Sequence, residues 1–403
     1  MPPALAQQPA ASIADYFSRA HETDRFASEV DGFDKLRFGF FGEVGGLLAA
    51  VKKVGRDQLK ETETELAGEE IGDALWYLVS VARRLEISAD ELGAACMRSL
   101  RNTFGETDRS AKAAISFRNL DGILAVHCHG LEVRRIELIN QLAHASGELL
   151  APTEASLRSM ESGKCLEQMG QLLSALALVA ASFGLRLEQL AEDNVTKICR
   201  RWPVQGTPYS GLFDELRRPH EQLPREFRME FIERDDGSGA YVVQEWNGVT
   251  IGDRLTDNHF EPDDYRFHDV FHLAYMAHLG WSPVIRALLK RKRKSDREID
   301  ENQDGARAMI IEEGIATWIF NHAKKRGDFF EGVEPGKLEY GLLKQVESMV
   351  AGYEVCVCPL WQWAIAITDG FAVFRELRKA RGGIVTVDML KHTVTFEQRA
   401  VKL

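Results

Sequence analysis

Residues 66–78 read LAGEEIGDALWYL. Three acidic residues, Glu69, Glu70 and Asp73, stand just before Trp76–Leu78, a run that belongs in the core of a protein. Carboxylates are costly to bury unless a positive group neutralises them. The stretch therefore indicates a helix whose acidic edge either binds a cation or faces water.

The sequence predicts helices almost throughout residues 13–201. Apolar residues recur there at spacings of three and four, the pattern of helices that bury one face. Proline is absent between Pro9 and Pro152, which suits long uninterrupted helices. Ser88 and Glu91 form a capping-box pattern, which indicates the start of a helix. We expect a mainly α fold for this half of the chain.

This helical region also repeats itself. The stretch EEIGDALWYLVSVARRLEISADELGAACMRSLRNTFG (69–105) aligns without a gap with EQMGQLLSALALVAASFGLRLEQLAEDNVTKICRRWP (167–203), which begins 98 residues later. Upstream, GEVGGLLAA (42–50) aligns with HASGELLAP (144–152). We predict two copies of one helical bundle, residues 13–110 and 118–203, which pack as an internal pseudo-dimer and bury each other's apolar faces.

A different pattern begins after residue 203. Proline and glycine break the helical periodicity between 203 and 225, which indicates a domain boundary. MEFIERDDGSGAYVVQEWNGVTIG (229–252) alternates like a β-hairpin with DGSG as its turn. The pattern is helical again over 263–380, and GGIVTVDML and HTVTFE near the end are extended. We predict a third domain, 204–403, of the α+β class and mostly helical.

Composition narrows the possible partners. The net charge is −11 and the sequence pI is about 5.6, which argues against broad binding to nucleic acid or acidic membranes. The longest apolar stretches, such as 171–185, are shorter than a membrane span, and the N-terminus does not resemble a secretory signal. Six scattered cysteines form no disulfide framework, so we expect a cytoplasmic protein. The basic run KRKRK (290–294) is either a phosphate or nucleic-acid site or a solvated charge run.

The acidic residues form a candidate metal site. Glu70 and Asp73 are three positions apart and share a helix face, and Glu43 lies on the preceding apolar helix. If the two helices pack antiparallel, Glu43 faces the other two acids. Three acids repel one another unless a hard cation lies among them, and oxygen ligands favour Mg²⁺ or Mn²⁺, which serve phosphate chemistry. Spacing alone leaves open the alternative of a solvated acidic helix edge.

GEVGGLLAAVKK followed by EEIGDALWYL resembles the all-α nucleoside triphosphate pyrophosphohydrolases, the MazG-like and dimeric-dUTPase superfamily. That family pairs an ExxE motif on one helix with an ExxD motif on the next. The resemblance covers residues 30–105, with 119–203 as a decayed second copy. It implies Mg²⁺-dependent hydrolysis of a nucleoside triphosphate to the monophosphate and pyrophosphate. It also implies a homo-oligomer, here a dimer of pseudo-dimers.

The resemblance assigns roles to particular residues. Glu43 matches the first acid of ExxE, and Glu70 and Asp73 match both acids of ExxD, as metal ligands and catalytic residues. The second acid of ExxE falls on Gly46, so one ligand is missing and a second ion or full activity is in doubt. Glu69 or a water molecule could substitute for that ligand, and Glu43 or Glu69 could take the proton from the attacking water.

The second copy has lost these acids, because Gln168, Gln171 and Ala145 stand in the places of Glu70, Asp73 and Glu43. It retains two polar residues, Asn194 and Lys197, which could contact the nucleotide across the pseudo-dimer. Two further candidates for phosphate contact, Lys52 and Lys53, follow the first motif. Each of these four residues could instead be structural or solvated.

A second candidate metal site lies in the C-terminal half. His268 and His272 in YRFHDVFHLAYMAHLGW are four apart on one helical face, and Glu312 and Glu313 stand inside another apolar helix. Two histidines with one or two glutamates could hold Zn²⁺, Mn²⁺ or Fe²⁺. The alternative is that the histidines are satisfied polar groups, with Asp269 and Glu313 as hydrogen-bond partners.

The region from EQLPREF to RFHDVFHLAYMAHLGWSP resembles a domain found downstream of MazG-like domains in some bacterial proteins, and it carries no activity over. We predict a Mg²⁺-dependent nucleotide pyrophosphohydrolase whose active site lies in the first repeat. The alternative is a nucleotide-sensing protein with weak or no turnover, which signals to a C-terminal metal-binding domain.

Overall fold

The computed structural model describes residues 12–54, 62–106, 115–237 and 239–399. These residues fall into two compact units, one ending at Cys199 and one beginning at Arg200. The predicted end of the first repeat, residue 110, lies outside the described residues.

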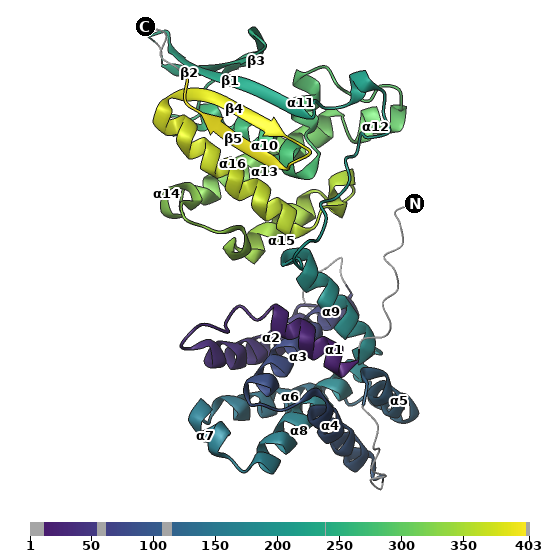
Figure 1. Cartoon of the computed structure of the whole chain (residues 1–403). Helices are drawn as coiled ribbons and strands as arrows, with labels where there is room; N and C mark the ends of the chain where they lie inside the picture. The colour runs from purple at the N-terminus through teal and green to yellow at the C-terminus, as the bar shows by residue number, and fades with distance from the viewer. Residues whose placement is uncertain (1–11, 55–61, 107–114, 238, 400–403) are drawn as a thin grey trace. The chain divides into compact units, whose positions relative to one another are not determined.

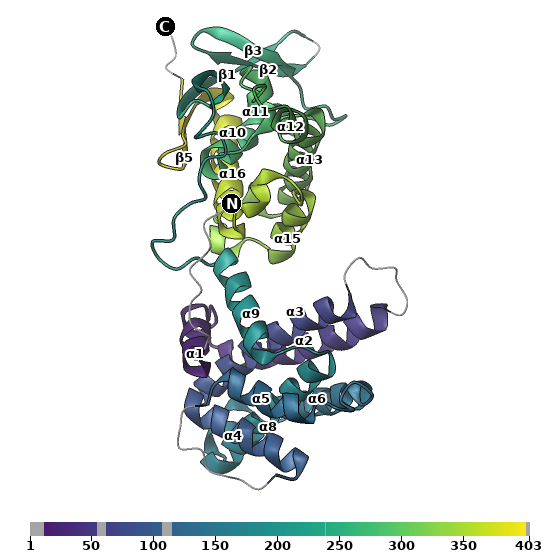
Figure 2. The same cartoon turned by 90° about the vertical axis from the view of Figure 1, so that its right-hand side faces the viewer.

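The N-terminal unit is mainly helical, as the periodicity predicts (Figures 1 and 2). Within the described residues up to Arg201 there are nine helices: α1 Ile13–Glu22, α2 Gly32–Val54, α3 Glu63–Arg84, α4 Ala89–Phe104, α5 Phe117–His127, α6 Arg135–Leu150, α7 Glu154–Ser159, α8 Ser162–Ser182 and α9 Leu187–Arg201. The duplication stays a prediction.

Several of these helices begin at reciprocal caps. Ser88 is the N-cap of α4, and its hydroxyl accepts a hydrogen bond from the backbone N–H of Glu91, while the Glu91 side chain accepts from Ser88. This confirms the predicted capping box. The same arrangement starts α1, α3 and α5, at Ser12, Thr62 and Ser116. Each cap satisfies backbone donors that the first turn leaves without partners, so local sequence sets these helix starts.

Helices α2 and α3 pack side by side through glycines on one face of α2 (Figure 2). A Cβ built at Gly39 would come within 2.2 Å of the Tyr77 ring, and one at Gly46 within 2.2 Å of the Glu70 carboxylate. These contacts run in opposite order along the two helices, so the pair is antiparallel. Glu43 lies between the two glycines on the same helical face. The packing therefore turns Glu43 toward the acidic edge of α3.

Helix α8 is the most apolar helix of this unit. By length and composition alone, Gly163–Ser182 could cross a membrane, but 67% of its apolar window is buried inside the fold. It packs against α3, α4 and α6. A core helix of a globular protein shows the same combination of composition and burial.

The C-terminal unit is built on an antiparallel sheet of five strands in the order β3-β2-β1-β4-β5. The strands are β1 Glu226–Asp235, β2 Ala240–Trp246, β3 Val249–Leu255, β4 Gly382–Asp388 and β5 Thr393–Glu397. The predicted hairpin corresponds to β1 and β2, and the predicted extended segments correspond to β4 and β5. Glu226 pairs with Asp388, so the end of the chain returns to the sheet beside its first strand.

Helices cover this sheet. The α-helices are α10 Asp269–Leu279, α11 Pro283–Leu288, α12 Arg297–Asn302, α13 Ala306–Ala323, α14 Gly327–Phe330, α15 Tyr340–Met349 and α16 Leu360–Ala380, with short 3₁₀ turns at Pro219–Glu221, Tyr265–Phe267, Pro335–Lys337 and Glu354–Val357. Helices α10 and α16 lie against β4 and β5 (Figure 1). Every residue of α10 is buried, so a polar side chain on this helix must find its partners inside the domain.

The basic run KRKRK contains a buried residue. Arg293 is fully buried, and its guanidinium donates to Asp304 Oδ1 and to Glu354 Oε1, each at 2.6 Å. Both interpretations of this run from the sequence, a ligand site or a solvated charge run, are therefore wrong for Arg293. Its bidentate bonds join two segments of the C-terminal unit.

Candidate functional site

The structure brings Glu43, Glu70 and Asp73 together on the facing sides of α2 and α3. Glu43 and Glu70 share a side-chain hydrogen bond, and the negative charge of Asp73 destabilises the ionised form of Glu43. All three side chains are partly exposed. An oxygen-rich group of this kind, open to solvent on one side, is the donor set that Mg²⁺ takes in proteins.

The close approach of three carboxyl groups changes the pKa values of two of them, Glu43 and Glu70. Burial, the negative charge of Asp73 and the hydrogen bond with Glu70 together raise the pKa of Glu43 to about 8. Burial also raises the pKa of Glu70. At neutral pH the pair therefore holds a proton that isolated carboxyl groups would release. A divalent cation would replace that proton and relieve the repulsion.

A third helix, α9, completes the site. Asn194 is 4% exposed, and its amide donates to Asp73 Oδ1 at 2.8 Å. The ammonium of Lys197 donates to Asp73 Oδ2 at 2.5 Å and to Glu69 Oε1 at 3.0 Å. Gly72 faces Asn194, and a Cβ built there would make an ordinary contact with the Cβ of Asn194 at 3.4 Å. Two candidates from the predicted second repeat thus contact the acids of the predicted first repeat.

The structure adds a residue that the sequence analysis did not find. Tyr16 on α1 is 1% exposed, and its hydroxyl donates to Asn194 Oδ1 at 2.8 Å. Burial and the charge of Asp73 raise the pKa of Tyr16 well above its usual value, so the phenol stays protonated. It fixes the amide of Asn194 with its N–H directed at Asp73. Tyr16 stands outside the repeated motifs, and no spacing in the sequence indicates it.

Lys52 and Lys53 lie apart from this group. Both are exposed in the last turn of α2. They stand nine and ten residues beyond Glu43, which is about 14 Å along the helix axis. The structure does not bring them to the carboxylates.

Gly46, at the position of the missing acid, has a structural explanation. The place that a side chain would take there is filled by the Glu70 carboxylate, whose Oε2 lies 2.2 Å from an ideal Cβ. An acid at position 46 would require Glu70 to move. The carboxylate of Glu70 thus lies in the space beside α2 that the missing side chain leaves.

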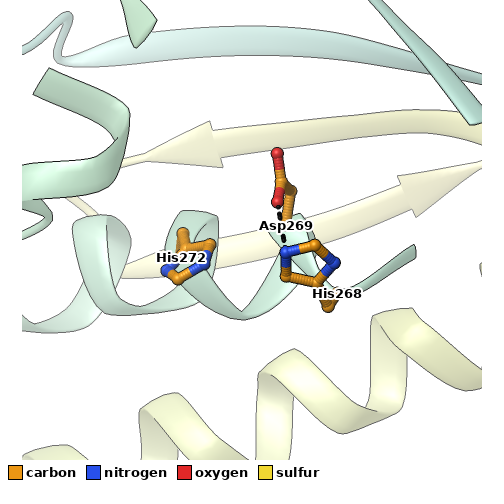
Figure 3. Close-up of side chains that lie close together, drawn as sticks. All are labelled: His268, Asp269 and His272. Carbon is orange, nitrogen blue, oxygen red and sulfur yellow. Dashed lines mark ion pairs between the residues drawn. The ribbon is translucent and has the colours of Figure 1, made fainter. Parts of the chain in front are cut away.

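The second candidate site lies in the C-terminal unit around α10 (Figure 3). One donor atom from each of His268, Asp269 and His272 lies within 4.8 Å of the others, so this buried group could hold a metal ion. His268 Nε2 is 3.0 Å from Asp269 Oδ1. Glu313 on α13 approaches from the second helix, with Oε2 3.7 Å from His268 Nε2 and 3.4 Å from His272 Nε2.

The four candidates predicted here separate into two roles. Glu312 is fully buried, and its oxygens accept from His272 Nδ1 at 2.9 Å, Ser282 Oγ at 2.6 Å and the N–H of Val284 at 2.8 Å. It lies behind His272 and is not a ligand, in contrast to the prediction. Asp269 was interpreted as a hydrogen-bond partner, yet it belongs to the group itself.

Charges inside this second group are strongly coupled. Burial would raise the pKa of Asp269, but His268, His272 and Gln244 lower it to about 2. Burial would lower the pKa of His272, but the carboxylates of Glu312 and Glu313 raise it well above its usual value. Negative charge is therefore retained beside the imidazoles, as a cation site requires.

We expect Glu43→Gln to stabilise the protein in the presence of a chelator at pH 8. The unfolded chain releases the Glu43 proton near pH 4.5 and the folded protein only near pH 8, so wild-type stability falls as the pH rises between these values. Glutamine removes that loss and keeps a donor for Glu70. Because Glu43 is partly exposed, we expect about 1 kcal/mol, or about 2–4 °C in Tm.

Thermal unfolding at pH 5 and pH 8 measures this effect. The difference in Tm between variant and wild type should grow from pH 5 to pH 8. A difference that is the same at both pH values would mean that Glu43 does not carry the raised pKa.

Comparison with known proteins assigns the C-terminal half. Residues 208–400 match the family model described as the MazG C-terminal domain, which confirms the second resemblance stated above. The N-terminal helical region has no family match, so its resemblance to the pyrophosphohydrolases stays a prediction. None of the curated proteins and none of the solved structures matches the chain. The protein is thus MazG-related through its C-terminal domain.

Proposed function

We propose that this protein is a Mg²⁺-dependent nucleoside triphosphate pyrophosphohydrolase of the cytoplasm, with its active site on α2, α3 and α9. The observation that carries the proposal is the hydrogen-bonded pair of Glu43 and Glu70 beside Asp73. Such a pair is electrostatically unfavourable without a cation. The match of the C-terminal half to a MazG-associated domain supports the same assignment.

Each residue near the carboxylates has a task in this proposal. Glu43, Glu70 and Asp73 would hold one Mg²⁺, which neutralises phosphate charge and lowers the pKa of a bound water. Oxygen from water forms a bond to the α-phosphorus as the bond to the pyrophosphate oxygen breaks. Glu69 is exposed at the edge of the group, and we assign it to accept the proton of the water. The products are a nucleoside monophosphate and pyrophosphate.

The proposal includes the duplication. Helix α3 ends at Arg84 and α8 ends 98 residues later, at Ser182. Helix α4 begins at Ala89 and α9 begins 98 residues later, at Leu187. This offset is the same as that of the sequence repeat. Ser12 and Ser116, the caps of α1 and α5, pair with each other in an antiparallel bridge, as residues beside a two-fold axis do.

The contacts of the two repeats also correspond across this axis. Gly72 on α3 packs against Asn194 on α9, and Gly170 on α8 packs against Ala95 and Cys96 on α4. The counterparts of Asp73 and Lys197, Gln171 and Ser99, line a cavity of roughly 200 Å³. By this relation the second repeat has lost the charged ligands, and a cavity lies at the corresponding positions. We also propose that two chains associate as a dimer of pseudo-dimers.

Lys197 supplies a positive charge in direct contact with the acids Asp73 and Glu69. In the proposed complex it turns from Asp73 to a phosphate oxygen once a metal neutralises the acids. We expect Lys197→Ala to raise KM for nucleoside triphosphates by about tenfold, the loss of one charge-assisted hydrogen bond. Steady-state kinetics measure it, with Lys164→Ala as the control, because the Lys164 side chain on α8 is 72% exposed. An unchanged KM would mean that Lys197 does not contact the nucleotide.

A nucleotide sensor is the second candidate function. The ion pairs of Lys197 with Glu69 and Asp73 favour it, because a fixed ammonium beside the acids competes with a metal ion. A sensor would gain thermal stability with nucleotide and release no pyrophosphate. An enzyme releases pyrophosphate with Mg²⁺ in a panel of nucleoside triphosphates, and Glu70→Gln abolishes that release.

A further inference from the structure

We infer that the C-terminal domain contains a mononuclear centre for a divalent transition metal, formed by His268 Nε2, His272 Nε2, Asp269 Oδ1 and Glu313 Oε2, with a coordination position left for water or a small anion. This inference is independent of the pyrophosphohydrolase proposal. It draws on described residues of α10 and its N-cap His268, of α13 and of the strand β2.

The imidazole nitrogens are already oriented for this role. His268 Nδ1 donates to the carbonyl oxygen of Tyr265 at 3.0 Å, and His272 Nδ1 donates to Glu312 Oε1 at 2.9 Å. Each bond occupies Nδ1, so Nε2 is the nitrogen that would bind a metal ion, with release of any proton it carries. Ligand histidines in metal sites are held in this way through their other nitrogen by a carbonyl or a carboxylate.

The carboxylate ligand is held by the same principle. The amide of Gln244 on β2 is buried and donates to Asp269 Oδ2 at 2.7 Å, which leaves Oδ1 directed at His268. The outer atoms of three donor groups thus have partners supplied by other elements of the fold. Such support would be superfluous for a set of histidines that merely fill space.

One atom in the group has no hydrogen bond. His272 Nε2 is completely buried and makes no hydrogen bond with any residue that the structure describes, although Glu313 Oε2 lies 3.4 Å away. A buried polar atom without a hydrogen bond is destabilising and calls for a specific cause. A metal ion bound at Nε2 would satisfy it. The donor atoms of His268, Asp269 and His272 lie within 4.8 Å of one another. Ligand atoms around a tetrahedral ion are about 3.4 Å apart, so only small side-chain movements are needed to bind one.

Access to the centre is through Glu313. Its side chain is 43% exposed, whereas those of His268, Asp269 and His272 are 9% exposed or less. Two nitrogens and two oxygens suit Zn²⁺, Mn²⁺ or Fe²⁺, whereas Mg²⁺ prefers oxygen ligands. A site with mixed ligands and one side toward solvent has the character of a catalytic centre more than that of a closed structural one.

The test uses full-length protein from which metal ions have been removed with a chelator. The protein is then titrated with Co²⁺ in the presence of excess Mg²⁺, so that Mg²⁺ occupies the N-terminal carboxylates. We expect one equivalent to bind with visible absorption. His268→Gln should abolish that absorption. Glu313→Gln should weaken Co²⁺ binding at least tenfold, and it leaves the core intact because the Glu313 side chain is partly exposed. Gln244→Leu should weaken it by about 10–100-fold, as loss of an outer partner does. Azide should shift the band, since a coordination position is open.

Matched controls separate this site from others. His322→Gln, on the same helix as Glu313 but paired with Glu339, should bind Co²⁺ as wild type does. Asp73→Asn should also bind normally, so failure of the N-terminal proposal leaves this result unaffected. The inference would be overturned if wild type bound less than a tenth of an equivalent of Co²⁺. It would also be overturned if Glu313→Gln and His268→Gln both bound Co²⁺ as tightly as wild type does. A band that azide leaves unchanged would overturn the open position.

Discussion

Asp73→Asn is expected to reduce pyrophosphate release by about 1,000-fold, because it removes a metal ligand worth several kcal/mol of transition-state stabilisation. The change is nearly isosteric, and the new amide can still accept from Asn194 through its oxygen. Folding should therefore be preserved. The effect should fall on kcat, since the lost interaction stabilises charge that develops during phosphoryl transfer.

Circular dichroism and pyrophosphate assays on the same preparation separate loss of catalysis from loss of structure. Glu86→Gln is the control, since Glu86 follows the same helix and its side chain is 89% exposed. Activity within tenfold of wild type in Asp73→Asn would place the chemistry elsewhere.

Arg293→Met is expected to destabilise the C-terminal domain by about 3–5 kcal/mol, the usual result of leaving buried charges without their partner. Asp304 and Arg293 are both fully buried, and Glu354 completes the network. For a domain of this size the loss corresponds to a fall in Tm of about 10 °C.

Arg297→Met is the matched control in this experiment. Within the described part of the chain Arg297 forms an ion pair with Glu301 on the helix surface, and its side chain is 87% exposed. We expect its Tm to stay within about 1–2 °C of wild type, as for most exposed ion pairs. Equal losses in the two variants would show that the buried network adds no stability.

The sequence predicts the N-terminal helices well because their signals are local. The start of α4 could be predicted from Ser88 and Glu91 alone, and Glu70 and Asp73 could be placed on one face from their spacing. To predict that Glu43 faces Glu70 and Asp73, one further assumption was needed, namely that the two helices pack antiparallel. Gly39 and Gly46 make this packing possible.

Features that join distant segments could not be predicted. Tyr16 meets Asn194 across 178 positions, and β1 pairs with β4 from the far end of the chain. The burial of Arg293 depends on Asp304 and Glu354 closing around it, and a run of basic residues carries no sign of that. In the second site, spacing identified the histidines, but the roles of Asp269 and Glu312 depend on which way each carboxylate points.

We propose that Glu43, Glu70 and Asp73 bind one Mg²⁺ in place of a shared proton. Calorimetric titration with Mg²⁺ at pH 7, in buffers of different ionisation enthalpy, tests it directly. Because the pKa of Glu43 is about 8, binding should release about one proton, and affinity should rise about tenfold from pH 6 to pH 7. Glu43→Gln should release none. Mg²⁺ binding without proton release, or no binding even at pH 8, would contradict the account.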